Sequence, residues 1–124
     1  MAQKLVLIVE DEPDNREIIR TVVEDLMGHA AALAADGEAA LTAIARRRPD
    51  LILMDLMMPV LNGFDTIRAL KSGPATAGIP VIALSALSRP RDQQQALAAG
   101  ADDYISKPFD LDLLADKIEA LLAD

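Results

Sequence analysis

Cysteine is absent from this chain of 124 residues, and histidine occurs only once, at His29. The absence of cysteine excludes disulfides, thiolate zinc sites, iron–sulfur clusters and thiol catalysis. Tryptophan is also absent, and the three aromatic residues are too few for a base-stacking platform. No apolar run approaches the roughly 20 residues that a membrane-spanning helix requires, and the N-terminus lacks a signal-peptide pattern. These features predict a cytoplasmic protein.

Positive charge is scarce as well, because 12 basic residues stand against 20 acidic ones and the formal net charge is −8. Nucleic acids and anionic membrane surfaces attract proteins through clustered lysine and arginine. We therefore expect neither a nucleic acid nor a membrane as a direct partner. The arginine run at 46–48 fits a solvated helix end favoured by the helix dipole rather than a binding patch.

Short apolar runs alternate along the chain with segments of helical periodicity. The runs do not alternate apolar with polar residues, so they predict strands that are buried on both faces. These strands are residues 5–9, 30–35, 51–54, 79–84 and 103–105, of which 30–35 is the weakest because alanine is a poor strand former. Apolar stripes at helical spacing predict helices over residues 13–26, from 39 up to Pro49, and over 64–70, 90–99 and 111–122.

The alternation of strand and helix predicts one α/β domain over residues 1–124, with a mostly parallel sheet and helices on both of its faces. Three residues suit the predicted helix ends. Pro13 fits a first helical turn, Gly100 a C-cap and Asp110 an N-cap.

Polar and charged residues stand at the carboxyl ends of the predicted strands. In parallel α/β folds these ends meet on one rim and form the ligand site. Taken singly, each of these residues fits a helix cap or a solvated loop. Together, three carboxylates on one rim need a cation, and oxygen ligands without histidine or cysteine favour Mg²⁺. The rim residues are Glu10, Asp11, Glu12, Asp55, Ser85 and Lys107.

Five segments at these strand ends carry a family resemblance. They are residues 7–12 (LIVEDE), 53–59 (LMDLMMP), 62–63 (NG), 84–86 (LSA) and 106–109 (SKPF). With all five in order, the chain resembles the receiver domain of two-component response regulators, the CheY-like family, over essentially its whole length. The resemblance implies a flavodoxin-like, five-stranded parallel sheet in strand order 2-1-3-4-5, flanked by five helices.

The resemblance also implies a phosphoacceptor and a metal site. Asp55 would accept a phosphoryl group from the phosphohistidine of a kinase or from a small acyl phosphate. Glu10 and Asp11 would hold Mg²⁺ together with Asp55 and the backbone carbonyl of Met57, Asp11 directly and Glu10 through water. Many family members carry aspartate where Glu10 stands, but a glutamate keeps the carboxylate that the chemistry needs.

Further residues would bind the phosphoryl group and transmit its presence. Ser85 and Lys107 would contact the phosphoryl oxygens, with help from the backbone N–H of Ala86. Serine stands at position 85 where threonine is commoner, which keeps the hydroxyl but leaves its rotamer less restricted. Ser85 and the aromatic Tyr104 would form the switch, although Tyr104 also fits a half-buried residue that finishes a strand. The surface from the fourth helix through the fifth strand to the fifth helix would then change its affinity for a partner.

Several smaller expectations complete the comparison with the family. The Lys107–Pro108 peptide would be cis. Pro59 and Asn62-Gly63 fit a loop in which glycine allows a positive backbone angle. Met57 and Leu87 would occupy positions that influence dephosphorylation. His29 fits an exposed turn residue far from the rim better than a phosphotransfer histidine.

The expected partners follow from this function. They are a sensor histidine kinase or a histidine phosphotransfer protein, and a downstream protein target, with the chain itself a monomer or weak dimer. The start at Met1 and the final helix favour a stand-alone regulator over a piece of a longer protein. We expect no enzymatic activity beyond self-phosphorylation and dephosphorylation.

Three rival functions differ in testable ways. A magnesium phosphohydrolase of the haloacid dehalogenase type requires a second aspartate two residues after the first, where this chain has Met57. A flavodoxin-like nucleotide binder requires hydroxyls and glycines in the first loop, where residues 10–13 (EDEP) would repel phosphate. A receiver-like interaction module that works without phosphorylation is the alternative that remains open.

Overall fold

A computed structural model describes residues 3–57, 63–86 and 89–123. Strands and helices alternate through these residues, as the sequence predicts. In chain order the elements are β1 (Leu5–Val9), α1 (Pro13–Thr21), the π-helix η1 (Val22–Leu26), β2 (Ala30–Ala34), α2 (Gly37–Arg46), β3 (Leu51–Asp55), α3 (Gly63–Ser72), β4 (Val81–Ser85), α4 (Pro90–Ala99), β5 (Asp103–Ser106) and α5 (Leu111–Leu122).

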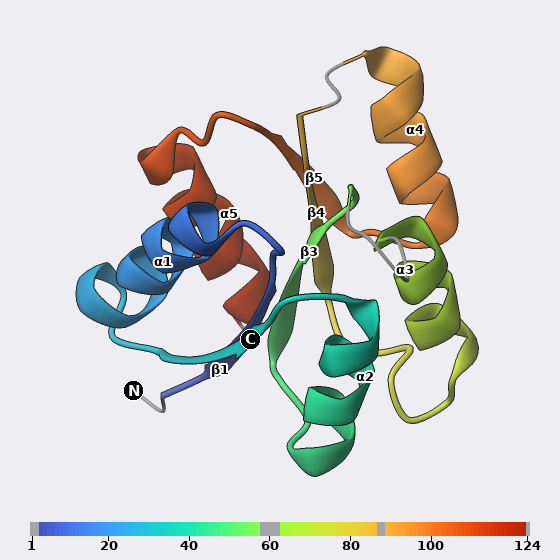
Figure 1. Cartoon of the computed structure of the whole chain (residues 1–124), viewed down its shortest axis with the longest axis horizontal. Coiled ribbons are helices and arrows are strands. Elements are labelled where there is room, and N and C mark those ends of the chain that lie inside the picture. Colours follow the sequence, from blue (N-terminus) through green and yellow to red (C-terminus); the bar gives the residue numbers. More distant parts are fainter. Residues whose placement is uncertain (1–2, 58–62, 87–88, 124) are drawn as a thin grey trace.

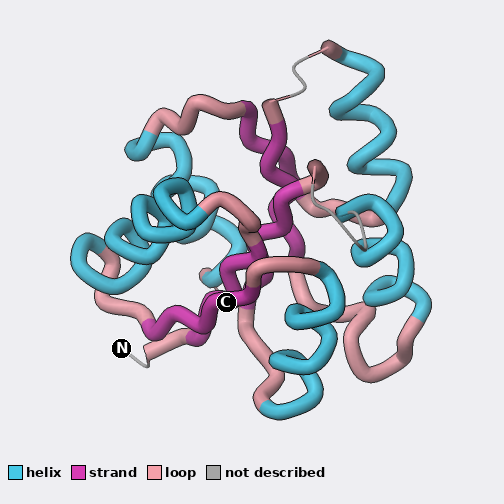
Figure 2. Tube along the Cα trace, viewed as in Figure 1, coloured by secondary structure: helices cyan, strands magenta, loops and turns pink. Residues whose placement is uncertain are grey.

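The five strands form one parallel sheet in the order β2-β1-β3-β4-β5, which confirms the predicted fold class. Figure 1 shows α1 and α5 on one side of the sheet and α2, α3 and α4 on the other. Figure 2 shows the strands as a central layer between these two groups of helices. This order places β1, β3 and β4 inside the sheet, so their carboxyl ends lie next to one another.

Each face of the sheet carries its own apolar core. Successive side chains of a strand point to opposite faces, so β1 divides its residues between the two cores. Leu7 and Val9 pack toward α2, α3 and α4 together with Ile67, whereas Val6 and Ile8 pack toward α1 and α5. The central strands β1, β3 and β4 are buried along their whole length, as their unbroken apolar sequences predict.

The predicted helix ends are confirmed. Pro13 begins α1, and the Asp110 side chain accepts hydrogen bonds from the first backbone N–H groups of α5. Gly100 follows α4 with a φ of 120°, in the left-handed region that favours glycine. Asp36, which the sequence analysis does not single out, caps α2 by accepting from the Ala39 N–H at 2.8 Å.

Some element bounds differ from the prediction. Strand β3 continues through Asp55 and β4 through Ser85, so these two residues end their strands rather than follow them. The helix predicted over 13–26 changes after Thr21 into η1, in which the Met27 N–H donates to the Val22 carbonyl five residues back. The wider turn rotates the end of the apolar stripe outward, and Leu26 is 71% exposed.

Two predictions about single residues are wrong. Gly63 does not adopt a positive φ; it begins α3, and an added Cβ would lie 2.3 Å from the Asp55 carbonyl oxygen. Gly63 is therefore needed for close approach, not for a turn conformation. His29 is half-buried rather than exposed, and its Nδ1 accepts a hydrogen bond from the Lys4 N–H at 3.2 Å.

The predictions for Pro59, Asn62 and Leu87 fall outside the described residues. The Lys107–Pro108 peptide is cis, as the family resemblance implies. Among the residues that the structure describes, no helix is both long and apolar enough to cross a membrane.

Candidate functional site

The register of the sheet brings the predicted rim residues together. Val9 of β1 pairs with Met54 of β3, so Glu10, the next residue along the chain, lies level with Asp55. Asp55 in turn pairs with Leu84 of β4, and Ser85 pairs with Ser106 of β5. Residues far apart in sequence therefore meet at one edge of the sheet because their strands are parallel and aligned.

Three carboxylates form the centre of this edge. Each of Glu10, Asp11 and Asp55 offers one oxygen that lies within 4.8 Å of the oxygens offered by the other two. Glu10 is fully buried and Asp55 is 1% exposed, whereas Asp11 is exposed at the mouth. Like charges this close repel one another, so the cluster requires compensating positive charge.

Lys107 supplies part of that compensation. Its Nζ lies 2.7 Å from Glu10 Oε1 and 3.1 Å from Asp55 Oδ2. Burial lowers the pKa of Lys107, but the two carboxylates raise it more, so the pKa lies above its ordinary value and the amine stays charged. The Lys107 N–H donates to the Ser85 carbonyl at 2.8 Å, which fixes the lysine at the end of β4.

Glu10 has the most perturbed environment of the cluster. Burial raises the pKa of Glu10 from 4.5 to about 7, and the adjacent Asp55 adds to this effect. Lys107 and the Glu12 N–H, which donates to Glu10 Oε2 at 3.1 Å, oppose it but do not cancel it. Burial therefore outweighs the ion pair at Glu10, and without further positive charge its carboxyl is partly protonated near pH 7.

The donor set fits Mg²⁺. Glu10 Oε1 is buried and makes no hydrogen bond with any described residue, because Lys107 Nζ approaches it as an ion pair outside hydrogen-bond geometry. A buried anionic oxygen without a hydrogen bond is costly, and a divalent cation is a suitable partner for it. All three side-chain donors are carboxylate oxygens, the ligand type that Mg²⁺ prefers.

The other predicted site residues lie around this cluster. Met57 is exposed, and its N–H donates to Asp55 Oδ1 at 3.0 Å. Ser85 is fully buried at the end of β4, and Ala86 follows it at the surface. Tyr104 is only 7% exposed and packs inside the core beneath α2, α3 and α4, so its ring points inward rather than lying half-buried at the strand end.

Two residues support the cluster in ways that the sequence did not predict. Arg16 of α1 donates from Nη1 to the Glu10 carbonyl at 2.9 Å and so ties the first helix to the loop that carries Glu10 and Asp11. Gly63 lets the start of α3 approach the Asp55 backbone, where any side chain would collide. An arginine six residues after an acid carries no recognisable sequence signal, whereas the glycine was noticed for the wrong reason.

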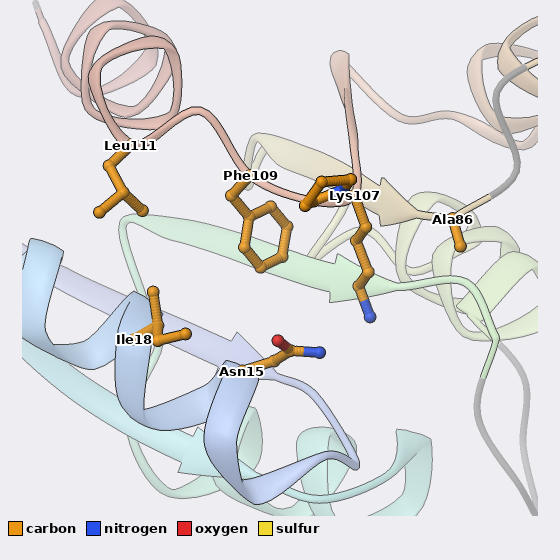
Figure 3. A pocket seen from close by; sticks show the side chains of 7 residues that line it. Asn15, Ile18, Ala86, Lys107, Phe109 and Leu111 are labelled. Atoms are coloured by element: carbon orange, nitrogen blue, oxygen red, sulfur yellow. The ribbon is translucent and has the colours of Figure 1, made fainter.

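A groove with a volume of about 590 Å³ lies beside the cluster. Figure 3 shows its lining side chains, which come from α1, from the segment after β4, from the segment between β5 and α5 and from the first residue of α5. Lys107 and Asn15 are the polar members of the lining. The others are Ile18, Ala86, Pro108, Phe109 and Leu111.

The order of the sheet and the lysine-paired carboxylates at its carboxyl edge define a class of small α/β signalling domains that accept a phosphoryl group on aspartate. Within that class, the chain belongs to the response regulator receiver domain family, whose family model matches residues 6–119. The family consists of signalling domains rather than conventional enzymes.

Similar proteins include regulators and kinases. The DNA-binding response regulator MtrA of Mycolicibacterium smegmatis is 40% identical over 117 residues, which cover 94% of this chain and 50% of that protein. The chain therefore spans about half the length of this curated relative.

Two solved receiver domains come from histidine kinases. The one from Syntrophus aciditrophicus has a TM-score of 0.89 and 39% identity, over 96% of this chain and 89% of the other. The one from Pseudomonas aeruginosa PAO1, solved with a magnesium ion in its active-site cleft, has a TM-score of 0.89 and 33% identity, over 99% of this chain and 100% of the other.

Proposed function

We propose that this chain is the phosphoacceptor switch of a two-component phosphorelay and that Asp55 is the residue phosphorylated. The observation that carries the proposal is the buried contact of Asp55 with Lys107 beside the two further carboxylates. A module that bound partners without phosphorylation would gain nothing from burying Glu10 with an oxygen that makes no hydrogen bond and pairs only with a lysine shared with Asp55. The same argument favours a working phosphoryl site over the phosphate-independent alternative.

In the proposed reaction, an oxygen of the Asp55 carboxylate attacks phosphorus, and the bond from phosphorus to the donor breaks. The donor leaves with the electron pair, as an imidazole from a phosphohistidine or as acetate from acetyl phosphate. Glu10 and Asp11, with Asp55 and the Met57 carbonyl, would hold Mg²⁺. Once bound, the metal neutralises charge that develops on the phosphoryl oxygens. Phosphoryl transfer needs little covalent chemistry from the protein, so positioning and charge balance dominate.

The charges of the site explain why each part is present. Three carboxylates carry −3 when ionised, and Lys107 returns +1, so a divalent cation brings the sum to zero. Phosphorylation replaces one carboxylate charge by about −2. Lys107, already 3.1 Å from Asp55, is placed to contact the added phosphoryl oxygens, together with the Ser85 hydroxyl and the Ala86 N–H.

The output would pass through Ser85 and Tyr104 to the surface formed by α4, β5 and α5. Ser85 and Ser106 are paired in adjacent strands, so a movement at the end of β4 acts directly on β5. On this surface Lys117 pairs with Asp103 at 2.9 Å, and Leu97 is exposed on α4. A changed arrangement there would alter the affinity for a downstream protein, in the manner of a two-state switch.

The groove in Figure 3 would receive the phosphodonor, a sensor histidine kinase or a histidine phosphotransfer protein. Its apolar lining and its position next to Lys107 suit a partner that brings a phosphohistidine to Asp55. We treat residues 1–124 as one receiver unit, a monomer or weak dimer, in the cytoplasm where ATP-dependent kinases work.

Intact mass spectrometry after incubation with acetyl phosphate tests the proposal. The wild type should gain one phosphoryl group only when Mg²⁺ is present, and Asp55→Asn should gain none. Asp116→Asn, an exposed acid of α5, serves as the matched control and should behave like the wild type. If the wild type gains no mass and also fails to bind beryllofluoride, the phosphoacceptor function is wrong and a constitutive binding module takes its place.

A further inference from the structure

The amide of Asn15 stands out in the groove beside the phosphoacceptor. The lining holds two polar side chains, and Lys107 is already engaged with Glu10 and Asp55. Asn15 is half-buried, and its amide makes no hydrogen bond within the described residues. Figure 3 shows this amide and the Lys107 amine extending into the same hollow from opposite sides. An amide among apolar neighbours needs a partner, and water or a bound group must provide it.

The position of the groove indicates what that partner is. Lys107 Nζ lies 3.1 Å from Asp55 Oδ2, and Lys107 lines the same groove as Asn15 and Ala86, so a phosphoryl group on Asp55 that contacts Lys107 would lie beside this groove. A water molecule that hydrolyses the phosphoaspartate must attack from the side opposite the Asp55 oxygen, which is the solvent side. Of the exposed residues described on this rim, Asp11 belongs to the proposed metal site, and the thioether of Met57 is too weak an acceptor to orient water.

We propose that Asn15 orients the water that removes the phosphoryl group from Asp55 and so sets the lifetime of the phosphorylated state. The side-chain carbonyl oxygen of Asn15 accepts a hydrogen bond from this water. The water oxygen bonds to phosphorus, the bond from phosphorus to the Asp55 oxygen breaks, and the carboxylate leaves with the electron pair. The proton lost by the water ends on the released inorganic phosphate. The amide acts as an orienting group and not as a base.

This inference rests on the proposed phosphorylation of Asp55. The rate at which the phosphoryl group is gained tests that proposal, and the rate at which it is lost tests the role of Asn15. The protein is phosphorylated with acetyl phosphate and Mg²⁺, the small donor is removed by rapid desalting, and loss of the phosphoryl mass is followed with time. Asn15→Leu keeps a similar volume and a good helix former but removes the amide. Ile18→Val changes the same groove one helical turn away and leaves the amide in place.

Asn15→Leu should gain the phosphoryl group at the wild-type rate, with the same Mg²⁺ requirement and melting temperature, and should lose it about five-fold more slowly, the effect of one hydrogen bond. Ile18→Val should match the wild type in both rates. Decay of Asn15→Leu at the wild-type rate would overturn the inference, as would slowed phosphorylation and decay in parallel. A defect seen only with a protein phosphodonor would also overturn it, because the amide would then belong to the docking contact. If the wild type forms no adduct and also fails to bind beryllofluoride, the proposed function itself fails.

Discussion

Replacing Glu10 by glutamine should stabilise the metal-free protein at pH 8. Glu10 is fully buried, and burial raises its pKa from 4.5 to about 7, so the folded protein holds a proton that the unfolded chain releases. The stability that comes from this proton is fully present below pH 4.5 and is lost as the pH rises through about 7. Glutamine resembles the protonated glutamic acid in shape and charge, and therefore keeps this stability at every pH.

The size of the effect follows from the pKa change. A rise from 4.5 to about 7 corresponds to roughly 3 kcal/mol of unfolding free energy, at about 1.4 kcal/mol for each pH unit. The loss of the Lys107 ion pair is already included, because the folded-state pKa reflects every neighbour of the carboxyl group. For a domain of this size, the change amounts to roughly 10 °C in Tm.

Far-UV circular dichroism is the suitable probe, because the chain has no tryptophan and one tyrosine. Thermal and urea unfolding of wild type and Glu10→Gln are compared at pH 5 and pH 8 in EDTA, with the exposed Glu119→Gln as control. Glu10→Gln should raise the free energy of unfolding by a large amount at pH 8 and by a small amount at pH 5. Mg²⁺ should reduce this difference from the wild type at pH 8, because it should bind the wild type more tightly than the variant. An equal gain at both pH values, or none at pH 8, would refute the reasoning.

Two substitutions away from the carboxylates test the packing around them. Gly63→Ala places a Cβ 2.3 Å from the Asp55 carbonyl oxygen and 2.6 Å from the Leu56 Cα, so α3 must shift. The free energy of unfolding, measured in urea, should fall by about 2 kcal/mol. Phosphorylation by acetyl phosphate should also become slower. A Gly63→Ala variant with the stability and the phosphorylation rate of the wild type would contradict this prediction. Ala32→Val partly fills a cavity of about 170 Å³ between β2 and α2, and valine favours a strand more than alanine does. The free energy of unfolding should therefore rise by about 1 kcal/mol, with a higher Tm. An unchanged Tm would show that the cavity is open enough for water to fill it without penalty.

The fold was predictable because its signals are local. Unbroken apolar runs such as 51–54 show strands buried on both faces, and caps such as Asp110 mark helix starts within a few residues. The change from α1 to η1 was not predictable, because the same apolar stripe fits both kinds of helix as far as Val23. Which turn forms depends on how η1 and Met27 pack against β2, a contact between segments that the pattern does not encode.

The site was predictable only as far as it lies on strand ends. Once the strands are parallel, Glu10, Asp55 and Lys107 must share an edge, and the register then brings them within ion-pair distance. Arg16 and Asn15 face this edge from α1, and their roles depend on the angle at which that helix packs. Gly63 depends on how closely α3 approaches β3, a distance fixed by tertiary packing rather than by any residue pattern.

The burial of Glu10 links stability to function in this domain. Burial raises the pKa of Glu10 to about 7, so its ionised form is disfavoured there, and a divalent cation bound at the site would offset that cost. A single lysine cannot offset it fully, because Lys107 is shared between Glu10 and Asp55. The proposed phosphorylation would draw Lys107 toward the new phosphoryl oxygens and so away from Glu10. A divalent cation bound in the phosphorylated state would keep Glu10 ionised, so its removal by EDTA should make the phosphorylated protein lose stability as the pH rises above 4.5.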